Sequence, residues 1–350
     1  MSAVLIEPTS SADERVAHVG ILRRLLVKPE FGALIGALVV FAFFAVQSDV
    51  FRSVVGAANW LDVSSTLGIM AVPVAMLMIG GQFDLSAGVQ TGTAGLATGI
   101  MTTYWGLNLY ASLAASLLLM LAIGFINGYL VTRTGLPSFI ITLGMFLGLQ
   151  GINLGGTKLV TNTVQVSNFD MVPGYQPLKN VLGSTITIAG TQFQITILWW
   201  ILITALGAYV LVKTVFGNWV YATGGEMNAS QNVGVPTSRT TISLFMLASV
   251  AAWFVGNTQI ARFGTIQAQV GIGQELIYIV AAVIGGCLLT GGYGSAVGAA
   301  IGALIFGMTQ QGIVYVGWNS DWFKLFVGAM LLLAVLSNQF VRRFAEQSRR

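Results

Sequence analysis

Residues 216–239 read FGNWVYATGGEMNASQNVGVPTSR, a polar interruption between two apolar runs that are each long enough to cross a bilayer. Its middle, residues 226–232, is predicted to form about two turns of helix, because the glycine pair at 224–225 precedes it and Gly234 and Pro236 follow it as stop signals. A helix this short and polar cannot span a membrane. We expect it to lie flat at the membrane surface and to transmit a movement of a soluble partner to the spanning helices on either side. The alternative is an ordinary solvated loop.

The composition of the chain is that of a polytopic membrane protein. Hydrophobic residues make up 55% of it and charged residues 8%, against roughly 25% charged residues in a soluble domain. The net charge of +4 sits mostly at the chain ends and in loops, which is typical of membrane orientation and argues against a nucleic-acid partner. Cys287 is the only cysteine and His18 the only histidine, so no disulfide, Cys/His metal cluster or histidine-based triad can form within one chain.

Ten apolar runs approach the ~20 residues that cross the hydrocarbon core of a bilayer. The predicted spans are 31–47, 61–80, 85–104, 108–131, 136–154, 195–213, 240–261, 274–290, 294–315 and 321–341. The runs at 274–290 and 321–341 are short, so nine or eleven spans remain as alternatives. The sequence predicts an all-α membrane domain of about ten transmembrane helices over residues 31–341.

Basic residues set the predicted orientation. With the N-terminus in the cytoplasm, eleven of them fall inside: Arg15, Arg23, Arg24, Lys28, Arg133, Lys213, Arg239, Arg342, Arg343, Arg349 and Arg350. Those outside are Arg52, Lys158, Lys179 and Arg262, while Lys324 begins the last run. This excess places 1–30, 216–239 and 342–350 in the cytoplasm of a multi-pass cell-membrane protein. Segment 155–194 then faces outward, and two stretches within it, LVTNTVQV and TITIAGTQFQITI, alternate polar and apolar residues as a small β-hairpin does.

Two glycine-rich stretches break the helix pattern. In IGGQFDLSAG at 79–88, Asp84 either lines the pathway or caps the next helix by accepting hydrogen bonds from free N–H groups. This stretch is weakly similar to the second one, IGGCLLTGGYGSAVG at 284–298. A second pair of similar stretches has Gly-x-Pro before a spanning run, TGLPSFIITLGMF and VGVPTSRTTISLF. These similarities predict broken, Gly-rich helices and an internal repeat, of the kind whose two halves meet around a substrate path. The alternative is that close helix packing alone selects small residues.

The chain shows no energy source of its own. GINLGGTK at 151–158 resembles a phosphate-binding loop, but it lacks the adjacent Lys-Ser/Thr pair and falls on the predicted outer side. The acids other than Asp84 near the spans lie at predicted helix ends, so no proton or sodium relay is indicated. We therefore expect the energy for transport to come from another chain.

Four stretches together resemble the membrane permease of ribose-type ABC sugar importers, a family related to branched-chain amino acid permeases. They are GGQFDLSAG, NGYLVTRTGLPSFIITLGMFLGLQGIN at 127–153, GNWVYATGGEMNASQNVGV and IGGCLLTGGYGSAVGAAIGAL. The cytoplasmic loop of that family reads approximately GGNEAA followed by a glycine. Gly224, Gly225, Ala229 and Gly234 keep its spacing, whereas Met227 stands at the usual glutamate and Glu226 lies one place earlier.

The resemblance implies a homodimer served by an extracytoplasmic solute-binding protein and by a cytoplasmic ATPase. The ATPase would bind ATP and Mg²⁺, which leaves this chain without a cofactor, metal or catalytic residue of its own. Access to the pathway would alternate as the ATPase closes. The implied ATPase-coupling residues are Gly225, Glu226, Ala229, Gly234 and Pro236.

Candidate pathway residues are polar or aromatic side chains in the predicted spans and at the first break: Asp84, Ser86, Asn127, Phe139, Phe146, Gln150 and Asn153. The alternative for each is interhelical hydrogen bonding or packing. The predicted function is import of a monosaccharide or related polyol through the lipid membrane. The nearest rival is a permease for a branched-chain amino acid or nucleoside, and the more distant rivals are a stand-alone secondary carrier and a membrane enzyme.

Overall fold

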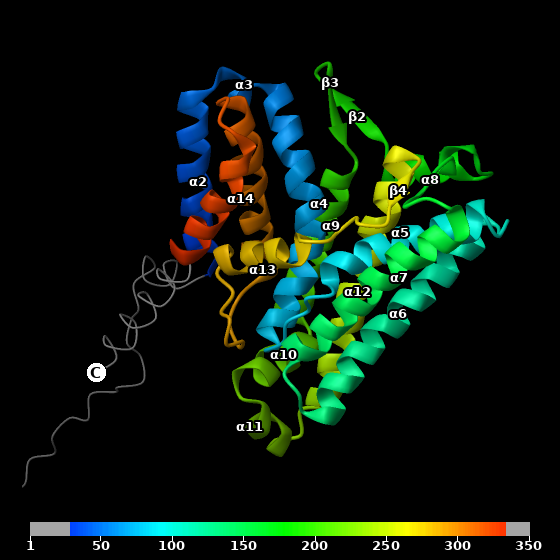
Figure 1. Ribbon diagram of the computed structural model, residues 1–350. Helices are drawn as coiled ribbons and strands as arrows, with labels where there is room; N and C mark the ends of the chain where they lie inside the picture. Colours follow the sequence, from blue (N-terminus) through cyan, green and yellow to red (C-terminus); the bar gives the residue numbers. More distant parts are fainter. Residues whose placement is uncertain (1–28, 334–350) are drawn as a thin grey trace, which may run out of the picture.

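The computed structural model describes residues 29–333 and shows an almost entirely helical chain (Figure 1). The predicted all-α membrane fold is confirmed. The longer helices are α2 (Pro29–Gln47), α4 (Val54–Ile79), α5 (Ala87–Thr103), α6 (Leu109–Thr134), α7 (Ser138–Thr161), α9 (Thr196–Lys213), α12 (Thr237–Phe263) and α14 (Ala296–Tyr315). The shorter elements are α3 (Asp49–Arg52), η1 (Phe169–Met171), α8 (Tyr175–Leu182), α10 (Val215–Gly225), α11 (Met227–Asn232), α13 (Gln274–Ile284) and η2 (Ser320–Trp322). The strands are β1 (Gln165–Val166), β2 (Thr185–Ile188), β3 (Thr191–Gln194) and β4 (Ile266–Gln267).

Within residues 29–333, seven helices are long and apolar enough to cross a membrane, namely α2, α4, α6, α7, α9, α12 and α14. Each coincides with a predicted run. Helix α5 fills the run at 85–104 with 17 residues, and α13 is shorter than the run at 274–290 because it ends at Ile284, before a glycine pair. Residues 323–333 are helical, and the rest of the run at 321–341 lies outside the described residues, as do 1–28 and 342–350. A total of about ten spans stays a prediction.

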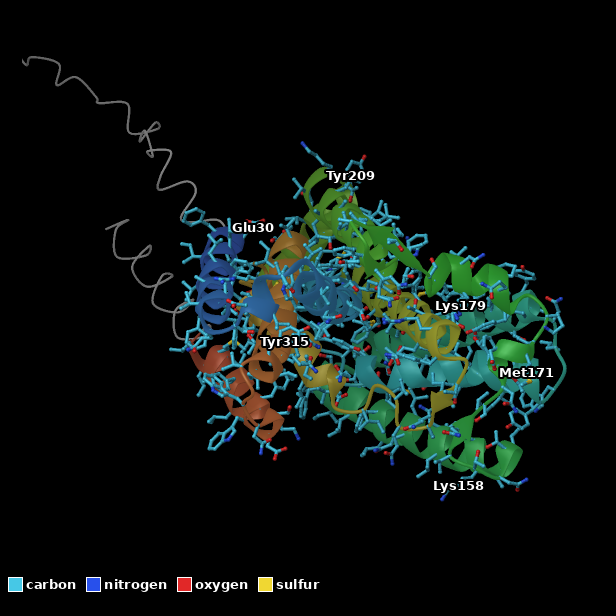
Figure 2. The ribbon with its side chains drawn as sticks, turned by 90° about the horizontal axis from the view of Figure 1, so that it is seen from above. Glu30, Lys158, Met171, Lys179, Tyr209 and Tyr315 are labelled. Atoms are coloured by element: carbon cyan, nitrogen blue, oxygen red, sulfur yellow. The ribbon has the colours of Figure 1, made fainter. Side chains whose placement is uncertain are left out.

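Helix α4 is the axis of the fold. Every residue from Leu67 to Ile79 is buried, as expected of a helix that is apolar on all sides. In Figure 1 it lies between a group formed by α2, α3 and α14 and a group formed by α5, α6, α7 and α12. Figure 2, seen from above, places Glu30 and Tyr315 over the first group and Lys158 and Met171 over the second.

The two glycine-rich breaks end their helices in the same way. The three N–H groups that follow α4 turn back onto its last turn, and those that follow α13 do the same at equivalent positions, Gly80–Gln82 and Gly285–Cys287. Gly81 (φ 80°) and Gly286 (φ 92°) hold the left-handed conformation that such a helix end requires. The predicted broken helices are confirmed.

The second pair of similar stretches agrees in its local structure. Helices α7 and α12 each begin directly after a proline, Pro137 and Pro236. However, the two pairs of stretches have different separations along the chain. A single tandem duplication therefore does not account for both, and the internal repeat stays a prediction for the α4–α5 and α13–α14 pairs.

The predicted hairpin in segment 155–194 is confirmed for TITIAGTQFQITI, whereas LVTNTVQV is not part of it, because residues 159–161 end α7 and only Gln165–Val166 in that stretch is a strand. Strand β2 pairs antiparallel with β3, and the residues between them, Ala189 and Gly190, both have positive φ (50° and 78°), as a two-residue turn that matches the strand twist requires. Strand β1 pairs with β4 and ties this segment to the chain after α12. In Figure 1 the hairpin and α8 lie at the end of the molecule opposite to α10 and α11.

Candidate functional site

The predicted short surface helix is confirmed as α11. It begins at Met227, one residue later than predicted, because Glu226 has an extended backbone that separates it from α10. Gly234 has a φ of 87° and α12 begins directly after Pro236, so both predicted stop signals act. Residues 215–225 are helical as well. The polar interruption is therefore a pair of short helices and not a solvated loop.

Helix α11 is exposed but attached on both sides. The hydroxyl of its buried Ser230 donates to the Ala222 carbonyl oxygen of α10 at 2.7 Å. Nε2 of Gln231 donates to Oγ1 of Thr237 in α12 at 2.8 Å. These two hydrogen bonds connect α11 to both α10 and α12. Among the predicted coupling residues, Pro236 is half-buried and the others are exposed, namely Gly225, Glu226, Ala229 and Gly234.

Helix α10 touches both glycine-rich breaks through glycine backbones. A Cβ on Gly224 would overlap the Ile79 carbonyl oxygen and the Gly292 nitrogen, and a Cβ on Gly291 would overlap Gly81. The N–H of Gly292 donates to the Ile79 carbonyl oxygen at 2.8 Å, which joins the two breaks directly. We call the contact of Gly81, Gly224, Gly291 and Gly292 the glycine junction. It brings three segments that are distant in sequence into backbone contact, so a shift of α10 bears on both breaks.

Asp84 belongs to a buried hydrogen-bond network, at whose edge Oδ1 of Asn127 has no partner among residues 29–333. Its Oδ1 accepts from the backbone N–H of Ser86 at 2.8 Å and from the Ser86 hydroxyl at 2.5 Å. Its Oδ2 accepts from Nε2 of Gln90 at 3.2 Å. Oγ of Ser86 accepts from Nδ2 of Asn127 at 3.0 Å, and the Ser249 hydroxyl donates to Oε1 of Gln90 at 2.6 Å. The network ties the first break to α5, α6 and α12.

This network matches the interhelical hydrogen bonding that was the alternative for Asp84, Ser86 and Asn127. Asp84 also accepts an N–H at the start of α5, which is the capping role considered for it. A direct contact of these three residues with solute stays a prediction.

The other predicted pathway residues lie along α7. Phe139 is exposed, Phe146 and Gln150 are half-buried, and buried Asn153 donates from Nδ2 to the Val89 carbonyl oxygen of α5 at 3.4 Å. These four residues lie outside the lining of the polar cavity described next. Their contact with solute likewise stays a prediction.

A polar cavity of about 300 Å³ lies among α4, α5, α12, α13 and α14. Its polar lining consists of Thr66, Thr91, Gln259, Gln274, Tyr278 and Gln310. The mostly non-helical chain between α12 and α13 adds Val270 and Gly271. We refer to this space as the glutamine cavity.

Sequence reasoning selected Asn127, Gln150 and Asn153 among the neutral polar side chains of the apolar runs and missed those of the glutamine cavity, because nothing in the sequence shows which of these side chains share a space. One signal was present. The stretch FGTIQAQVGIGQ at 263–274 interrupts two apolar helices with glycines and glutamines. Such non-helical chain is expected in a membrane protein where it lines a cavity.

The match to known proteins covers all of these features. A family model described as "Branched-chain amino acid transport system / permease component" matches residues 56–335, which include both breaks, α10, α11 and the glutamine cavity. The chain belongs to this permease family. The family predicted from the sequence is confirmed, and the chain is a membrane transport subunit rather than an ATPase.

Three curated relatives illustrate how far the similarity of this permease extends. The xylose transport system permease protein XylH of Haemophilus influenzae is 29% identical over an alignment of 353 residues, gaps included. The alignment covers 86% of this chain and 94% of that protein. The ribose import permease protein RbsC of Escherichia coli K12 is 31% identical over 306 residues, with 87% and 92% covered. The autoinducer 2 import system permease protein LsrC of Photorhabdus luminescens is 30% identical over 307 residues, with 88% of each covered. No solved structure matches the permease significantly.

Proposed function

We propose that this permease forms the membrane pathway of an ATP-binding cassette importer for a monosaccharide or related polyol. Access to the pathway alternates as a partner ATPase closes. Similarity to permeases named for xylose, ribose and fructose supports the solute class. The observation that carries the proposal is the placement of α11, an exposed polar helix whose neighbour α10 touches both helix breaks through the glycine junction.

The structure supports a distinct place for each soluble partner. The ATPase, which supplies ATP and Mg²⁺ binding, docks on α11, and the solute-binding protein docks at the opposite end, where the β2–β3 hairpin and α8 lie (Figure 1). The excess of basic residues at the α11 end of the predicted topology makes that end cytoplasmic. A second copy of the chain completes the pathway as a homodimer. This last assignment rests on the family resemblance.

A second candidate function is import of a branched-chain amino acid. The description of the matching family favours it, because that description names branched-chain amino acid transport. The two candidates share the ATPase, the alternating access and the fold. They differ in whether the solute carries charged groups. The transport assay below distinguishes the two candidates.

We expect the permease, reconstituted in liposomes with its ATPase and solute-binding protein, to take up labelled monosaccharide only when ATP is supplied. The assay measures uptake of D-ribose, D-xylose, D-fructose and L-leucine. Uptake of leucine alone would favour the second candidate, and uptake without ATP would identify a stand-alone carrier.

The same assay tests α11 through Ala229→Trp. Ala229 is exposed, so tryptophan leaves the packing of the subunit intact but overfills a groove on the ATPase, at a typical cost of about 1–3 kcal/mol. Membrane expression should stay normal, while co-purification with the ATPase and uptake should fall. Ala42→Trp, at an exposed position of α2, is the matched control and should retain both. Normal ATPase association and uptake in Ala229→Trp would make α11 a mere linker.

A further inference from the structure

We propose that the glutamine cavity is a solute-binding site within one subunit and that it takes an uncharged, polyhydroxylated solute of monosaccharide size, an inference that rests on the importer function proposed above. The cavity is formed by five helices of the same chain and by the non-helical chain between α12 and α13. Its recognition chemistry follows from three properties of its lining: unpaired amides, the lack of charge, and size.

The cavity holds three carboxamides that the protein leaves unpaired. The side chains of Gln259, Gln274 and Gln310 make no hydrogen bond to any other residue in the range 29–333. A carboxamide offers an N–H donor and a carbonyl acceptor side by side. A sugar hydroxyl also donates and accepts, so each amide can satisfy one or two hydroxyls. The hydroxyls of Thr66 and Thr91 donate to carbonyl oxygens of their own helices, Asp62 at 3.5 Å and Gly88 at 2.8 Å, and therefore add acceptors on α4 and α5.

The lining carries no charge among the residues that the structure describes. The nearest acids by sequence are engaged elsewhere. Both carboxylate oxygens of Asp62 accept from the Arg262 guanidinium, at 2.9 and 2.8 Å. Both oxygens of Glu275 accept from the Gly273 N–H, at 3.2 and 3.0 Å, and the side chain packs toward Gly88 of α5.

This neutrality separates the two candidate solutes. An amino acid brings a carboxylate and an ammonium group, and burying either one without a charged partner is costly. A sugar brings neither. The glutamine cavity therefore favours a polyol over a zwitterion.

The size of the cavity limits the solute. Its volume of about 300 Å³ lies at the low end of the range for small-molecule sites, ~300–1,000 Å³. Val63, Leu67 and Val270 add apolar side chains to the lining, against which the C–H groups of a sugar ring can pack. A single ring fits this space, whereas an oligosaccharide does not.

The first test is protection from labelling. Gln310→Cys in a Cys287→Ser background places one thiol at the cavity, where Gln310 is exposed, and Gln311→Cys places one at the next position of α14, outside the lining. N-Ethylmaleimide labelling is followed in the complete transporter with D-ribose, D-xylose, D-fructose or L-leucine present. We expect a monosaccharide to slow labelling at position 310 and not at 311, and leucine to slow neither. Protection by leucine, or by none of the sugars, would overturn the proposal.

The second test is transport by Gln274→Leu and Gln310→Leu. Leucine keeps roughly the volume of glutamine and removes its hydrogen bonds, so uptake at low sugar concentration should fall about tenfold in each variant, while Gln311→Leu should transport as the wild type does. Normal sugar uptake in both cavity variants would overturn the site and leave the importer function standing. Failure of the wild type to take up any monosaccharide, with sugar protection at position 310 intact, would count against the importer function alone.

Discussion

Asp84 shows how one residue can hold an intramembrane break together. Oδ1 of Asp84 accepts from Ser86, and Oδ2 accepts from Gln90. The side-chain oxygen of Gln90, Oε1, already accepts from the Ser249 hydroxyl, which fixes the direction of each hydrogen bond. Gln90 therefore has only its N–H groups to offer Asp84. The carboxylate is needed as an acceptor on both oxygens.

This geometry predicts that Asp84→Asn is not a silent change. The new amide would set an N–H donor against Nε2 of Gln90, so the two N–H groups that face each other would lack acceptors in a buried site, at a cost of about 1–3 kcal/mol, while Nε2 keeps its bond to Oγ of Ser86 at 2.8 Å. We expect the purified variant to unfold at a lower temperature than the wild type in detergent. Asp84→Ala should be less stable still, because it also removes the bonds to Ser86.

A compensating change provides the control. In the double variant Asp84→Asn with Gln90→Glu, the donor and acceptor exchange places, and the new carboxylate at position 90 can still accept from the Ser249 hydroxyl. Stability should recover only in part, because the bond from Nε2 of Gln90 to Oγ of Ser86 is lost. An Asp84→Asn protein as stable as the wild type, or a double variant weaker than the single one, would contradict this account of the network.

Among the elements, the glycine junction is the contact that joins the surface helices to the membrane helices. Helix α10 also donates from the Tyr221 hydroxyl to the Gly294 carbonyl oxygen of the second break, at 2.9 Å. Contacts through α10 therefore connect α11 directly to the ends of α4 and α13, along which a movement of α11 can be transmitted. Side chains at these positions would hold the three backbones apart.

We expect Gly224→Ala to separate docking from transport. The added methyl group overlaps the Ile79 carbonyl oxygen, so α10 must move away from the breaks, while exposed α11 still binds the ATPase. Co-purification with the ATPase should persist and uptake should fall. Gly148→Ala, in α7 with no heavy atom within 4 Å of the added carbon, is the matched control. Wild-type uptake in Gly224→Ala would show that the junction is not part of the transmission route.

At the scale of the whole molecule, the surface helices and the hairpin lie at opposite ends (Figure 1). We predict that α11 faces the cytoplasm and the hairpin faces outward. Asn228→Cys and Thr187→Cys, each exposed, are placed in a Cys287→Ser background. An impermeant maleimide added to intact spheroplasts should label position 187 at once and position 228 only after permeabilisation. The Cys287→Ser parent supplies the baseline, and labelling of both positions from outside would reverse or discard the topology.

The local features of this permease follow from its amino-acid sequence alone. Apolar runs located the long helices because burial in lipid requires about 20 consecutive apolar residues. Gly234 and Pro236 marked the end of α11 and the start of α12, because backbone conformations available to glycine and proline depend on those residues alone. The alternation in TITIAGTQFQITI located the hairpin for the same local reason.

Which of these features meet depends on how the helices pack. Glycine carries no side chain that points to a partner, so nothing in the sequence paired Gly224 with Gly81 and Gly291. Gln259, Gln274 and Gln310 lie on three different elements, and their common cavity depends on how α12, α13 and α14 cross. Asp84 was marked as a candidate by its charge, but its partners Gln90 and Ser249 come from helices that only packing brings together. Hydrophobic burial fixes which segments enter the membrane, and the fit of helix surfaces fixes which polar groups face one another.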